Sequence, residues 1–113
     1  MKGYTDIEQS KKLSEILPLE SADMCYCMWD RPLAFFQSYE RANFINCDNN
    51  AIPCWSLAAL LDVLPEIQGG KPVIALDDNY ITYPHISDLH TKADNIVDAC
   101  VVMIIKLHEL NLL

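Results

Sequence analysis

Glycine, positive charge and long apolar runs are all scarce in this chain of 113 residues. The three glycines include one adjacent pair, Gly69-Gly70, and this scarcity excludes a glycine-rich phosphate-binding loop. Eight lysines and arginines stand against sixteen acids, a net charge of −8, so we expect no direct nucleic-acid binding. The longest apolar run covers residues 99–105, far short of the roughly 20 residues that span a bilayer, so we expect no membrane partner.

Apolar residues and cysteines are, by contrast, abundant. The apolar fraction is 51% and the charged fraction 21%, which leaves apolar surface uncovered and makes a homo-oligomer plausible. Residues 1–12 lack the apolar core of a signal peptide, so we expect a cytoplasmic protein whose five cysteines are reduced. The length predicts one domain that covers residues 1–113.

Three segments carry the signals of helices. Residues 5–17 open with a T-x-x-E capping box, Thr5 with Glu8, and are followed by Pro18. Residues 57–64 follow the N-cap Ser56, and Trp55 before it is expected to pack on Leu60. The last helix is expected from the N-cap Asn95, supported by Asp98, to about Leu110, with Asn111 as a left-handed stop. Because this helix is apolar all round, it predicts a buried centre, with a subunit interface as the alternative.

The strand signals are weaker. A strand over 24–29 is apolar on both faces and is therefore expected to be an inner strand. The other expected strands are a hairpin of 71–76 and 80–84 joined through 77–79, and two short strands over 33–39 and 42–47, the first of which is also compatible with helix.

These elements predict an α+β fold: a single small domain with two longer helices and one short helix packed on a small, mainly antiparallel sheet. The expected core residues are Tyr26, Trp55, Leu57, Leu60, Leu61, Leu64, Val97, Cys100, Met103, Ile104 and Leu107.

A metal site is the first chemical candidate. Its ligands would be thiols and imidazoles, namely Cys25, Cys27, Cys47, Cys54, His85 and His90. Buried thiols explain the same pattern, and the C-x-C spacing differs from a zinc knuckle, so we expect no metal.

Two catalytic candidates are also weak. Cys54 near a helix start would need His85 or His90 as its base, and a packed cysteine explains it better. Asp77-Asp78 is typical of a solvated turn. We therefore predict no catalytic residue and no cofactor.

A recognition surface is the strongest functional candidate. Aromatic residues and arginines, which are enriched at binding hot spots, gather in one stretch with Trp29, Arg31, Phe35, Phe36, Tyr39 and Arg41. An aromatic core under the first helix would explain the stretch as well.

Three segments resemble a known family. They are IEQSKKL at 7–13 with ADM at 22–24, IPCWSL at 52–57, and residues 98–107. Together they resemble a family of small uncharacterised proteins of gut Bacteroides-type bacteria and their prophages or mobile elements, with residues 30–50 matched least. The resemblance implies a bacterial or phage-borne cytoplasmic protein and supplies no catalytic residue.

Three hypotheses for function follow. We favour a non-enzymatic protein–protein interaction or assembly module of phage or mobile-element origin. The alternatives are a small cysteine- or histidine-dependent enzyme, and an acidic inhibitor or mimic that acts on a nucleic-acid-binding protein. The mimic requires the acids of residues 62–98 to line one face.

Overall fold

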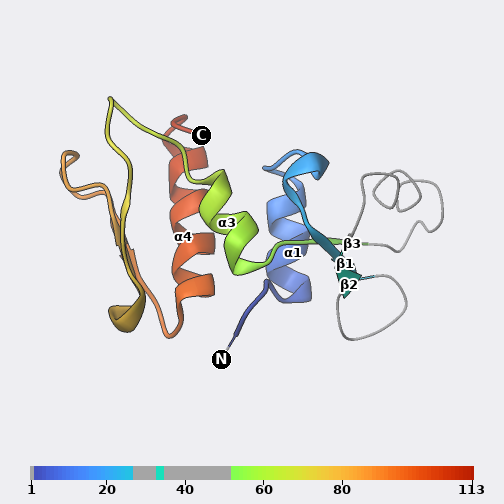
Figure 1. Cartoon of the computed structure of the whole chain (residues 1–113). Coiled ribbons are helices and arrows are strands. Elements are labelled where there is room, and N and C mark those ends of the chain that lie inside the picture. The colour runs from blue at the N-terminus through green and yellow to red at the C-terminus, as the bar shows by residue number, and fades with distance from the viewer. Residues whose placement is uncertain (1, 27–32, 35–51) are drawn as a thin grey trace.

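Short helices and strands alternate in the computed structural model, which describes residues 2–26, 33–34 and 52–113 (Figure 1). Among these residues, the α-helices are α1 (Ile7–Ser14), α3 (Leu57–Val63) and α4 (Ile96–Glu109), and the 3-10 turns are η1 (Leu19–Ser21) and η2 (Leu76–Asp78). The strands are β1 (Met24–Tyr26), β2 (Leu33–Ala34), β3 (Ile52–Cys54), β4 (Val73–Ala75), β5 (Tyr80–Thr82) and β6 (His90–Lys92). The predicted α+β class is confirmed.

The described strands form two antiparallel sheets where the sequence predicted one. The first sheet has the order β2-β1-β3 and pairs Cys25 with Leu33 on one side and with Pro53 on the other. The inner position of the predicted strand is therefore confirmed for residues 24–26, and residues 27–29 lie outside the described residues. β3 is a strand that the sequence did not predict, and it tolerates Pro53 because it is an edge strand.

The second sheet has the order β4-β5-β6. The predicted hairpin is confirmed as β4 and β5, and Asn79 closes it with a left-handed φ of 52°. β6 was not predicted, because His-Thr-Lys has little strand signal by itself; Thr91 pairs with Ile81 of β5.

Helix α4 supplies the centre of the core. It lies between the second sheet and α3, with α1 beyond (Figure 1). Asn95 accepts from the Asp98 N–H at 2.8 Å, as expected for its N-cap, and Asn111 has the expected positive φ of 58°. Eight of its residues are buried, so the buried-centre interpretation is confirmed.

The core prediction is largely confirmed. The predicted residues that are buried are Tyr26, Trp55, Leu60, Leu64, Val97, Cys100, Met103, Ile104 and Leu107. Leu57 and Leu61 are only partly buried against this core. Ser56 caps α3 as predicted, and both Trp55 and Leu60 are fully buried at its start.

The predicted start of the first helix is wrong by one residue. Asp6, and not Thr5, is the N-cap, and its capping box is made with Gln9 instead of Glu8. Thr5 is fully buried and is hydrogen-bonded on both sides to Trp55: its N–H donates to the Trp55 carbonyl at 2.9 Å, and its Oγ1 accepts from the Trp55 N–H at 3.2 Å. Pairing with the segment before α3 therefore outweighs the local capping signal. The helix ends at Ser14, three residues before the predicted end.

Candidate functional site

The predicted recognition surface cannot be placed. Its residues, Trp29, Arg31, Phe35, Phe36, Tyr39 and Arg41, all lie outside the described residues, as do Cys27 and Cys47.

Cys54 lies in a buried polar cluster between β3 and the start of α1. Its Sγ lies 3.5 Å from Thr5 Oγ1 and 3.4 Å from the Thr5 carbonyl, which also accepts from the Tyr26 hydroxyl at 2.7 Å. Burial raises the pKa of the Cys54 thiol, and hydrogen bonds from Thr5 and Ser10 offset this only in part. A fully buried thiol with a raised pKa does not suit a thiolate nucleophile.

The cysteines and histidines of the described part do not converge. Cys54 pairs with Met24 and Cys25 with Pro53, so the two thiols point to opposite faces of their sheet. His90 lies in the other sheet, and His85 Nε2 donates to the Ile67 carbonyl at 2.6 Å. Within residues 2–26, 33–34 and 52–113, no group of three metal-ligating side chains forms.

One convergent polar set lies where the first turns of α1 and α4 meet. Lys2 Nζ contacts Asp98 Oδ1 at 2.8 Å, Gln9 Oε1 at 2.9 Å and Asp6 Oδ2 at 3.1 Å. Asp98 also accepts from Gln9 at 2.7 Å and from Asn95 at 2.9 Å. Because these groups satisfy one another, the set ties the two helices together.

The pKa values of this set agree with a structural ion pair. Burial alone would raise the pKa of Asp98, but hydrogen bonds from Lys2, Gln9 and Asn95 leave it below its ordinary value of 3.8. Burial alone would lower the pKa of Lys2, but the contacts with Asp98 and Asp6 leave it raised.

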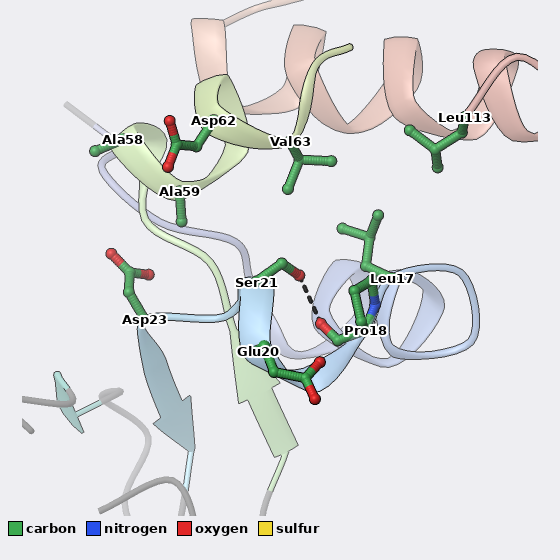
Figure 2. Close-up of a pocket in the computed structure, with 10 residues that line it drawn as sticks. All are labelled: Leu17, Pro18, Glu20, Ser21, Asp23, Ala58, Ala59, Asp62, Val63 and Leu113. Atoms are coloured by element: carbon green, nitrogen blue, oxygen red, sulfur yellow. Dashed lines mark hydrogen bonds between the residues drawn. The ribbon is translucent and has the colours of Figure 1, made fainter. Parts of the chain in front are cut away.

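A pocket of about 600 Å³ opens between η1 and α3 (Figure 2). Its apolar wall comes from Leu17, Pro18, Ala58, Ala59, Val63 and Leu113, and its polar lining from Glu20, Ser21, Asp23 and Asp62. The lining holds three carboxylates and no basic side chain, so the pocket suits an apolar group that carries positive charge.

Two polar groups of this pocket are already used within the fold. Asp23 accepts from both the N–H and the hydroxyl of Ser56, the N-cap of α3. Ser21 donates to the Pro18 carbonyl at 2.6 Å and accepts from the Trp55 indole at 2.9 Å. Only Glu20 and Asp62 remain as carboxylates with no role in the described packing, so the pocket is a weak candidate.

The β4-β5-β6 sheet presents a second surface. Ile74, Ile81 and Thr91 form one row across it, and the buried Ile81 and Thr91 face α4. Because side chains alternate along strands, the neighbouring positions form an opposite, outer face: Val73, Ala75, Tyr80, Thr82, His90 and Lys92.

The character of this outer face changes from apolar on the β4 side to His90 and Lys92 on the β6 side. The β4 side carries Val73, with Leu76 directly after the strand, and each is 53% exposed. The middle carries Tyr80 and Thr82, and the Tyr80 ring lies 6.0 Å from the ring of His90 on β6. The apolar part therefore lies at an edge of the sheet.

Five of the acids of residues 62–98 lie at separate places in the fold. Asp77 and Asp78 are exposed in η2 at one end of β5, while Asp88 lies in the turn at its other end. Asp62 lines the pocket and Asp98 binds Lys2. This distribution does not favour the acidic-mimic hypothesis.

Comparisons of the chain with protein-family models, with curated proteins and with solved structures find no match. The resemblance to the Bacteroides-type family therefore stays a prediction. No helix in the described part of the chain is both long and apolar enough to cross a membrane.

The sequence contains one indication of the β4 surface. In residues 71–77, a base and an acid, Lys71 and Asp77, flank a short apolar segment. Only the strand order shows that this segment lies at a sheet edge.

Proposed function

We propose that this protein is a non-enzymatic protein–protein interaction or assembly module that binds its partner through β4. The observation that carries the proposal is the exposure of Val73 on the edge strand β4 and of Leu76 directly after it, at 53% each. An exposed apolar edge strand offers both apolar area and backbone hydrogen bonds to a second protein chain.

The gain from covering these side chains is appreciable. Removing the exposed half of a valine or leucine side chain from water is worth about 1 kcal/mol. Two such residues beside a free strand edge therefore support a modest but specific association.

Two double variants test the proposal. The test variant is Val73→Ser with Leu76→Ser, and the matched control is Val102→Ser with Leu110→Ser, whose side chains are 48% and 53% exposed on and directly after α4. Each pair removes one valine and one leucine of nearly equal exposure.

The measurement is sedimentation velocity of each purified protein, followed by capture from bacterial lysate with each protein as bait. We expect the unmodified chain and the control to form the same stoichiometric complex, with a second copy or with another protein, and the β4 variant to lose it. A complex that survives in the β4 variant, or that is lost only in the α4 control, contradicts the proposal, as does the absence of any complex.

The other sequence-based hypotheses find less support. The buried Cys54 thiol does not favour the cysteine-dependent enzyme. The scattered acids do not favour the acidic mimic. The cytoplasmic location and the phage or mobile-element origin stay predictions.

A further inference from the structure

We propose that the partner at β4 is a second copy of this chain, whose own β4 pairs with it antiparallel about a two-fold axis at Ile74. The β4-β5-β6 sheets of the two copies then join into one sheet of six strands. This inference rests on the proposed function and names its partner.

The hydrogen bonds that flank the β5–β6 pairing show which backbone groups of β5 point toward β6. The Ala93 N–H donates to the Asn79 carbonyl at 3.3 Å, and the Tyr83 N–H donates to the Leu89 carbonyl at 2.9 Å. Because bonding directions alternate along an antiparallel strand, the odd-numbered residues of β5 point their backbone groups toward β6.

The even-numbered residues of β5 therefore bond to β4. Tyr80 pairs with Ala75, and Thr82 pairs with Val73. By the same alternation, the N–H and C=O of Ile74 point away from β5, to the edge of the sheet at which no other described strand pairs. Ile74 is thus the residue that can exchange two hydrogen bonds with a partner strand.

The sequence around Ile74 is complementary to itself when one copy is reversed. In the register that pairs Ile74 with Ile74 of the second copy, Val73 lies opposite Ala75. Lys71, which precedes β4, then lies toward the η2 turn of the second copy, which carries Asp77. Lys71 and Asp77 are both exposed. Each copy thus supplies the base for one ion pair and the acid for the other, while the apolar residues meet in the middle.

Strand shortness and an edge proline usually protect a sheet edge from pairing. Here β4 has three residues and is preceded by Pro72, so it offers a second copy only a short length of edge. The structure therefore points to a weak dimer whose population rises with concentration.

A charge exchange between Lys71 and Asp77 tests the register. Lys71→Asp places two acids near each other at both ends of the dimer, and Asp77→Lys places two bases there. Each variant alone should dimerise about tenfold more weakly than the unmodified chain, because the interaction at both ends changes from attraction to repulsion. An equimolar mixture of the two variants restores both ion pairs and should recover the dimer.

The matched control exchanges charge at the opposite edge, with Lys92→Asp and Asp94→Lys, which are also exposed. Sedimentation velocity over a concentration series is the measurement for the five proteins and the two equimolar mixtures. A monomer at every concentration, a dimer indifferent to the Lys71 and Asp77 variants, or a dimer sensitive only to the controls overturns the inference.

The outcome also separates the two proposals. If the chain stays monomeric but captures another protein that the Val73→Ser and Leu76→Ser variant releases, the proposed function stands and the second-copy inference fails. If no complex of either kind depends on β4, both fail.

Discussion

At the scale of single residues, Asp98 is a side chain through which pH acts on the stability of the fold. Its carboxylate holds Lys2 at 2.8 Å, and its pKa in the folded protein is lower than its ordinary value of 3.8. The stability that it contributes is therefore present above about pH 3.8 and is lost as the pH falls through the folded pKa.

Asp98→Asn is expected to lower the free energy of unfolding at pH 7 by about 1 kcal/mol, because the ion pair with Lys2 is lost. The loss should shrink as the pH falls through the folded pKa of Asp98, because the native carboxylate then becomes protonated as well. Urea unfolding at several pH values measures this, with the exposed Asp94→Asn as control. A loss that stays equal down to the acid unfolding of the protein would show that the ion pair is not the cause.

Gly70 makes a close contact that no other residue allows. It closes a tight turn with Ile67, in which each N–H donates to the other's carbonyl at 2.9 Å and Gln68 and Gly69 have positive φ. The ring of His85 occupies the space where a Cβ at position 70 would lie.

Gly70→Ala should therefore displace His85 and break its hydrogen bond to the Ile67 carbonyl, at a cost of about 1 kcal/mol. Gly3→Ala is the matched control, because a Cβ there meets no atom within 4 Å. Thermal unfolding and the ring chemical shifts of His85 provide the measurement. Unchanged His85 shifts in Gly70→Ala would contradict this account.

At the scale of elements, Thr5 joins α1 to the segment before α3. Its hydroxyl lies 2.8 Å from the buried Ser10 hydroxyl and accepts from the Trp55 N–H. Thr5→Val keeps the shape but leaves the buried Trp55 N–H unpaired and removes one partner of the Ser10 hydroxyl, which should cost about 2 kcal/mol. Thr5→Ser keeps the hydroxyl and should cost less.

Chemical denaturation of the two Thr5 variants measures this difference. If Thr5 were only the helix N-cap that the sequence suggests, Asp6→Ala would hardly change the free energy of unfolding. Thr5→Val would then lower it by no more than the roughly 1 kcal/mol that an N-cap contributes. The structure predicts the opposite: Asp6→Ala should show the cost of the cap, and Thr5→Val the larger loss.

Elements with local signals are the ones that the sequence predicts well. Ser56 and Asn95 cap their helices as expected, and Asn79 and Asn111 adopt the left-handed backbone that their side chains tolerate. In each case the interactions that decide the local conformation are made with residues only a few positions away in the sequence.

Elements that depend on distant partners were missed. β6 forms because Thr91 pairs with Ile81 of β5 and its hydroxyl donates to the Ala99 carbonyl at 3.0 Å, and neither contact is visible in the sequence His-Thr-Lys. The division into two sheets has the same origin, since strand order comes from tertiary packing. The candidate site at β4 was missed for this reason too, because the sequence does not show that Lys71 and Asp77 flank a sheet edge.

At the scale of the whole molecule, charge and apolar surface act in opposite directions. The net charge of −8 repels a second copy over most of the surface, while the apolar residues of β4 attract it. Lys71 is the base that allows the acidic Asp77 of a second copy to approach. Salt should therefore have two effects, weakening the Lys71–Asp77 pairs and screening the general repulsion.

Hydrogen–deuterium exchange of the Ile74 amide, compared between dilute and concentrated protein, tests the central claim most directly. We predict that exchange at Ile74 slows as concentration rises, while the segment of α4 around Val102 exchanges at the same rate in both samples. Exchange at Ile74 that is independent of concentration, or slowing confined to α4, would contradict association through β4.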